Sequence, residues 1–134
     1  MSNLVVFIVL LVHGIGHLQG VVVALGLKDF GKWHSRSRLL EKWLSPASQR
    51  TVCFTLFMIT AIIALVFALC FQGLVLTNIS WKLPGFLTAT LSFISMALYP
   101  KAFAMFFNHI GAVSVNLIIY YAIFISDEWL VNLS

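Results

Sequence analysis

The hydrophobic positions of this chain fall into four long stretches, which polar residues interrupt at helical intervals. The stretches cover residues 4–27, 51–76, 83–99 and 102–126. Each is about 17 to 26 residues long, which is the length an α-helix needs to cross a bilayer. The pattern therefore predicts an all-α fold with four transmembrane helices.

The third and fourth stretches are separated only by Pro100 and Lys101. A turn there leaves the fourth helix a full span. A turn near residues 108–111 would instead leave only about 15 residues before Asp127 and Glu128, too few for a comfortable crossing. We favour the turn at Pro100.

Composition agrees with a membrane location. Hydrophobic residues make up 61% of the 134 residues, and charged residues only 9%. Soluble domains carry about 25% charged residues. We therefore expect an integral membrane protein with one domain over residues 1–134, a four-helix bundle whose first partner is the lipid bilayer.

Basic residues predict the orientation of the bundle. The segment of residues 28–50 holds six of the eight Lys and Arg residues, and Lys101 falls on the same side. Only Lys82 lies opposite. By the positive-inside rule, the 28–50 segment is cytoplasmic and both termini lie outside, in the periplasm or extracellular space.

Within this basic segment, four apolar residues recur at helical spacing among charged ones. They are Leu39, Leu40, Trp43 and Leu44. This pattern predicts a short amphipathic helix on the cytoplasmic membrane surface, whose charges meet lipid phosphates rather than nucleic acid. Ser45 and Pro46 then form an N-cap and first-turn proline for the second span.

Two histidines and several glycines occupy the middle of the first stretch. At about 100° per residue, His13, Gly16, His17 and Gly20 fall on one face of the helix, whereas Gln19 points elsewhere. Ionisable residues inside a membrane span usually face the interior of a bundle. We therefore expect this stripe to face the other helices.

The other helices carry matching stripes. On the second helix the stripe consists mainly of small rather than polar residues: Cys53, Phe57, Thr60, Ala61, Ala64 and Ala68. On the third it is hydroxylic: Thr88, Ser92, Ser95 and Tyr99. On the fourth it runs through Ala102, Met105, His109, Ala112, Asn116, Tyr120 and Asp127.

Depth indicates which of these groups meet. At about 1.5 Å per residue, His109 lies about 11 Å and His17 about 15 Å from the cytoplasmic ends of their helices. His13 is one turn further out, near Asn116. The sequence therefore predicts a cluster of these three histidines. Its surroundings would be Asn116, Ser92, Ser95 and Tyr120.

Such a cluster suits a redox cofactor or a metal. Haem b would take His17 and His109 as ligands, with Gly16 and Gly20 keeping the backbone clear of the porphyrin. Zinc or copper would take His13, His17 and His109. We slightly prefer haem b.

The alternative is a protein without a cofactor. Histidines and glycines also serve helix packing, so the chain could be an accessory or scaffold subunit that binds partner membrane subunits or a second copy, or a small transporter. The sequence contains no nucleophile elbow, phosphate loop or paired carboxylate. Catalytic residues are therefore not assigned, and whether the protein is an enzyme stays open.

Overall fold

The fold is all-helical, as predicted. The computed structural model describes residues 3–27, 34–75, 80–103 and 106–124, and contains no strand within them. Four α-helices and one 3-10 helix follow one another along the chain. They are α1 (Asn3–Leu25), α2 (Pro46–Phe71), α3 (Lys82–Leu98), η1 (Pro100–Phe103) and α4 (Phe106–Phe124).

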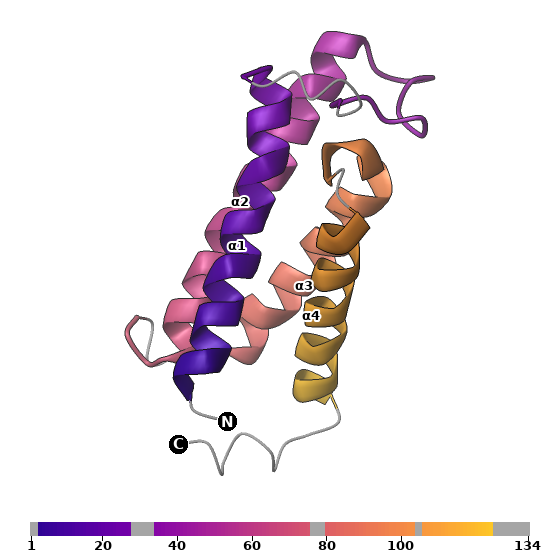
Figure 1. The fold of residues 1–134 in the computed structure, drawn as a ribbon. Helices are drawn as coiled ribbons and strands as arrows, with labels where there is room; N and C mark the ends of the chain where they lie inside the picture. The colour runs from indigo at the N-terminus through magenta and orange to yellow at the C-terminus, as the bar shows by residue number, and fades with distance from the viewer. Residues whose placement is uncertain (1–2, 28–33, 76–79, 104–105, 125–134) are drawn as a thin grey trace.

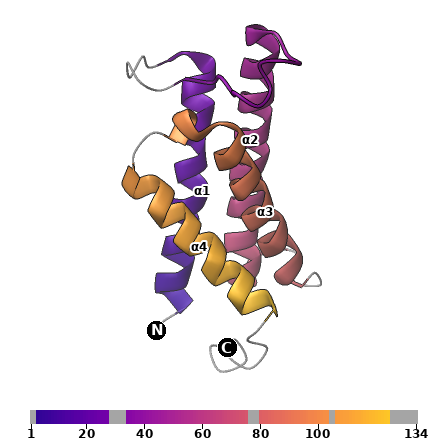
Figure 2. The same cartoon turned by 90° about the vertical axis from the view of Figure 1, so that its right-hand side faces the viewer.

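The helices pack in chain order. α1 and α2 run antiparallel and share the most extensive contact, α3 packs on α2, and α4 packs on α3 (Figure 1). α4 slants across the bundle, and its contact with α1 is small (Figure 2). The start of α2, the end of α3 and η1 lie at the same end of the bundle, which we call the basic-segment end. The bundle is therefore closed along α1–α2–α3–α4 but only loosely between α4 and α1.

Glycines end the first two helices earlier than the sequence suggested. Gly26 and Gly73 adopt φ values of 68° and 67°. Leu74 N–H donates to Leu69 O at 3.0 Å and Gly73 N–H to Cys70 O at 2.9 Å, a Schellman motif, and the same pattern closes α1. The predicted ends at residues 27 and 76 are therefore too late. α2 begins at Pro46, before the apolar stretch that starts at residue 51, and Ser45 Oγ accepts the Ser48 N–H at 3.2 Å, as the predicted N-cap indicated.

The boundary between α3 and α4 lies at Pro100, the turn that the sequence favoured. Pro100 has no N–H to continue the helix, and the chain forms η1 instead, with Ala102 N–H donating to Tyr99 O at 3.0 Å. α4 begins at Phe106, four residues later than the predicted 102. The predicted end at 126 lies outside the described residues, as do Met105, Asp127, Lys28 and Lys32.

The prediction of an amphipathic helix in the basic segment is wrong. The described part forms successive turns, with Glu41 N–H donating to Ser37 O at 3.1 Å and Leu44 N–H to Leu40 O at 2.9 Å. The buried Gln49 side chain forms hydrogen bonds with the backbone at both ends of these turns. Its Oε1 accepts from Ser37 N–H at 2.8 Å, and its Nε2 donates to Leu44 O at 3.0 Å. These bonds to α2 replace the continued backbone ladder that a helix would need.

Within the described residues, two helices are long and apolar enough to cross a bilayer by length and composition. They are Leu4–Leu25, with a mean hydropathy of 2.1, and α2, with 2.8. The apolar parts of α3 and α4 are shorter. Large apolar side chains are exposed at mid-helix positions of all four helices. Examples are Val12, Ile15, Ile62, Ile94, Leu117 and Ile118.

Candidate functional site

Polar side chains gather in the interior of the bundle. Six of them have no exposed surface at all: His17, Thr60, Thr88, Ser92, Ser95 and Asn116. The stripes predicted for the second and third helices are all buried, so those faces are confirmed. Since the exterior is apolar, polar chemistry in this protein is concentrated inside.

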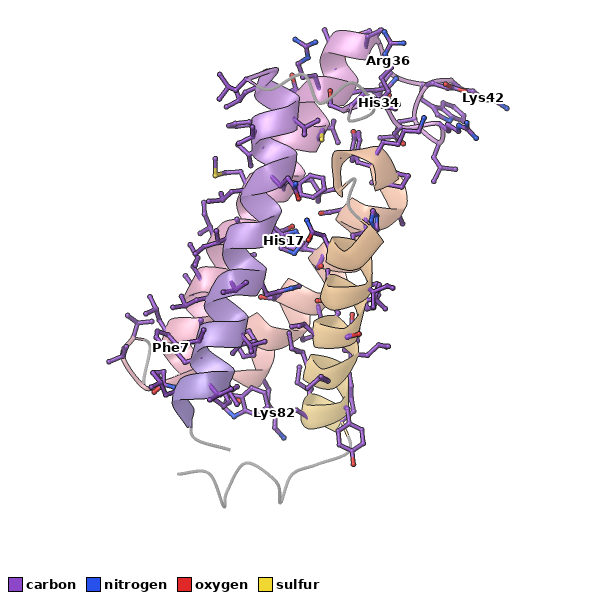
Figure 3. All side chains as sticks on the ribbon, in the orientation of Figure 1. Phe7, His17, His34, Arg36, Lys42 and Lys82 are labelled. Atoms are coloured by element: carbon purple, nitrogen blue, oxygen red, sulfur yellow. The ribbon has the colours of Figure 1, made fainter. Side chains whose placement is uncertain are left out.

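His13 and His17 of α1 form a close pair. Their ring centroids lie 5.0 Å apart, with the ring planes at 88°, an edge-to-face arrangement. His17 projects from α1 toward α3 and α4 (Figure 3) and packs on the Phe57 ring, with centroids 6.0 Å apart. His17 is fully buried, whereas His13 keeps 8% of its surface. His13 is therefore the member of the pair at the edge of the interior.

Hydrogen bonds tie the surrounding polar groups across helices. Asn116 Nδ2 donates to Ser92 Oγ at 2.7 Å, joining α4 to α3, and the Asn116 side chain also lies beside His13. Ser95 instead pairs with Thr60 of α2, with the hydroxyl oxygens 3.3 Å apart. The structure thus places Asn116 beside His13 and bonds it to Ser92 of α3.

Tyr120, also predicted near the site, bonds elsewhere. Its hydroxyl lies 2.7 Å from Thr90 Oγ1, and its ring stacks on Phe93 with centroids 6.0 Å apart. These contacts hold α4 against α3. Within the described residues, Tyr120 is a packing residue of that interface.

The two glycines of the predicted site have opposite surroundings. A Cβ at Gly20 would overlap the Phe57 ring, so this glycine admits Phe57 rather than leaving space for a cofactor. At Gly16, no described atom outside its own turn lies within 4 Å of the Cβ position. Free space beside the histidines is therefore found at Gly16 and not at Gly20.

That space is a groove between α1 and α4. Its volume is about 340 Å³, and His13 and Gly16 line it from α1 while Asn108 and Gly111 line it from α4. The rest of the lining is apolar: Ile8, Val9, Val12, Ala112 and Val115. The groove exists because α4 slants away from α1, leaving the side of the bundle partly open.

A bond that the sequence did not indicate joins the two helices beside the groove. Asn108 Nδ2 donates to Gln19 Oε1 at 3.1 Å. Gln19 lies off the histidine stripe, so helical periodicity alone placed it away from the site. The signal that could have found the pair is the presence of Gln19 in the first apolar stretch and of two asparagines, Asn108 and Asn116, in the fourth, since buried amides need partners.

His109 is half-buried on α4 and does not line the groove, although the preceding Asn108 does. Among the described residues, no group of three or more His, Cys, Asp or Glu side chains lies close enough to hold a metal ion. The structure therefore brings His13 and His17 together, while a site completed by His109 stays a prediction.

Comparisons with protein families, curated proteins and solved structures find no match to this chain.

Proposed function

We propose that this is a four-span membrane protein that binds haem b in the groove between α1 and α4, with His13 as an iron ligand. The observation that carries the proposal is the position of His13. It is a nearly buried imidazole at the wall of an open-sided groove that is lined, apart from Asn108, by apolar residues and glycines. An imidazole nitrogen in such a place is the common protein ligand of haem iron.

The distribution of polarity supports four spans. Large apolar side chains cover the outside of all four helices, while histidine, asparagine and hydroxyl groups lie inside. Apolar surface of this extent is not left facing water in soluble monomers. α3 and α4 have 17 and 19 residues, which is within the spanning range of about 17 to 25.

The lining of the groove favours haem over a bare ion. Zinc or copper needs three or four ligands from N, O or S donors, and the groove offers one imidazole and one amide among apolar side chains. A porphyrin ring is itself apolar and needs only one or two axial nitrogens. The groove volume of about 340 Å³ falls at the small end of the 300–1,000 Å³ typical of ligand sites, and its open side leaves room for the ring edge.

The remaining site residues have supporting roles in this proposal. His17 packs edge-to-face on His13 and limits its rotation, and the Asn116 side chain also lies beside His13. Gly16 and Gly111, one on each wall of the groove, would leave space for the porphyrin ring. His109 remains the candidate second ligand from α4. Bound haem would supply one-electron redox chemistry.

The absorption spectrum of the purified protein tests the proposal. We expect a Soret band in protein from cells supplied with iron and a haem precursor. His13→Ala should abolish it, and Gly16→Leu should weaken it by filling the groove while both histidines remain. The matched controls are His34→Ala, which removes a histidine far from the groove, and Ile15→Leu, which changes a lipid-facing neighbour; both should keep the band.

Other outcomes would overturn either the haem assignment or the choice of His13 as its ligand. Colourless protein with stoichiometric zinc or copper by elemental analysis would favour the metal site of His13, His17 and His109. Colourless, metal-free protein would favour the accessory or scaffold subunit. A Soret band that survives His13→Ala and is lost in His109→Ala would move the iron ligand to α4.

A further inference from the structure

A second pocket lies at the basic-segment end, far from the histidine pair. Its volume is about 320 Å³, and it forms where residues 34–39 meet the end of α3 and the start of η1. Its polar lining consists of His34, Arg36, Arg38 and Lys101. Three of the eight Lys and Arg residues of the chain thus meet in one concave site, although they come from segments about sixty residues apart in sequence.

The polar side chains of this pocket can all act as hydrogen-bond donors. Arginine and lysine have no acceptor. His34 Nδ1 accepts the Arg36 backbone N–H at 3.2 Å, which places the ring proton of the neutral imidazole on Nε2. Among the residues that the structure describes, no Asp or Glu lines the pocket. Its chemistry therefore suits an anion rich in acceptor oxygens.

Besides burial, the positive charge of the pocket contributes to a lowered pKa of His34. Partial burial, with the nearby Lys101 and Arg36 cations, lowers the pKa of His34 below its ordinary value. The imidazole is thus neutral at pH 7. A bound anion would be attracted by the arginine and lysine charges without competition from a carboxylate of the pocket.

Apolar residues complete the site. Leu39 and Leu98 line the pocket beside the cations, and Leu39 is 63% exposed. Trp43, one turn further along, is 82% exposed. Figure 3 shows His34, Arg36 and Lys42 gathered at this end of the helices. Exposed leucine and tryptophan next to basic residues are typical of a membrane interface, where acyl chains meet phosphates.

We propose that this pocket binds the phosphate group of an anionic phospholipid, with one wall, Arg36 and Arg38, from the basic segment and the other, Lys101, from η1. The phosphate would link the segment to the end of α3. Free phosphate shares the same chemistry, but it would leave the exposed apolar rim unused. The site is separate from the histidine groove and does not depend on haem binding.

Lipid binding to the full-length protein in neutral detergent tests the proposal. Native mass spectrometry would count bound phosphatidylglycerol and, as a zwitterionic reference, phosphatidylcholine. We expect phosphatidylglycerol to bind at least about tenfold more tightly, and Arg36→Gln with Lys101→Gln, one cation from each wall, to remove that preference. The matched control is Lys42→Gln with Arg50→Gln, which removes the same charge at the same end but outside the pocket and should keep it.

Three results would overturn the proposal. Equal losses of the preference for phosphatidylglycerol in the two double variants would show diffuse electrostatic attraction and no defined site. An unchanged preference in Arg36→Gln with Lys101→Gln would place the lipid elsewhere. Titration with inorganic phosphate distinguishes the sources: binding of phosphate alone that requires Arg36 and Lys101, with no preference for phosphatidylglycerol, would assign the pocket to a soluble phosphate. Circular dichroism of each variant confirms that its helices are retained.

Discussion

At the scale of single residues, two glycines on the same face of α1 have different surroundings and different structural roles. Gly16 and Gly20 are one turn apart on the histidine face of α1. Phe57 of α2 occupies the space over Gly20, whereas Gly16 opens on the groove. His17 and Phe57 are both fully buried, so this part of the α1–α2 contact is tightly packed.

Gly20→Ala should therefore destabilise the protein, by about 1 to 3 kcal/mol, because the new methyl group overpacks the Phe57 ring. Gly16→Ala is the matched control, and we expect no loss there, since a mid-helix alanine is favoured over glycine by about 0.5 to 1 kcal/mol. Thermal unfolding in detergent measures both. Equal melting temperatures for the two variants would contradict the packing assigned to Gly20.

At the scale of elements, the helix ends are set by local backbone chemistry. α1 and α2 both stop at a glycine with positive φ, and α3 stops before Pro100. The apolar stretches of the sequence continue to residues 27, 76 and 99, past the ends of these three helices. Helix length in this protein is therefore decided by the residue that can turn the chain.

Gly73→Ala should lower stability by about 1 to 2 kcal/mol, because an L-residue is strained in the left-handed conformation that closes α2. Nothing described lies within 4 Å of its Cβ position, so the loss would come from the backbone and not from a clash. Gly111→Ala, equally free of contacts but inside α4, should not be destabilising. A melting temperature that falls in Gly111→Ala and not in Gly73→Ala would refute this account.

At the scale of the whole molecule, the bundle has a mainly apolar interior that contains a cluster of polar groups, apolar mid-helix surfaces and one loosely closed side. The contact between α1 and α4 is small, and the Gln19–Asn108 bond is its polar link. The basic segment lies at the opposite end from the start of α1 (Figure 1). The proposed orientation places this end in the cytoplasm.

Cysteine labelling in intact cells tests that orientation. In a Cys70→Ser background, which leaves only the buried Cys53, a cysteine replacing the exposed Trp43 should react with a membrane-impermeant maleimide only after the cells are opened. A cysteine replacing the exposed Leu74, at the other end of α2, should react in intact cells. The reverse pattern would invert the topology and place the basic pocket outside.

What the sequence determined by itself is the presence of the four α-helices and most of their buried faces. Helical periodicity marks which side of a helix is polar or small, and burial in this bundle follows it at Thr60, Ser92 and Asn116. Pro100 and the Ser45 N-cap act through local backbone geometry, so those positions were also predictable. Local rules were enough wherever the deciding interactions lie within a few residues.

The tertiary structure alone decided how these faces meet. Periodicity treats Gly16 and Gly20 alike, and only the packing of α2 against α1 fills one space and leaves the other open. Helical periodicity placed Gln19 away from the site, yet the slant of α4 brings Asn108 within hydrogen-bond distance of Gln19. The basic pocket likewise needs Arg36 and Lys101 to meet across the end of α3. Such contacts depend on the relative placement of whole helices, which packing over the entire bundle determines and no local pattern encodes.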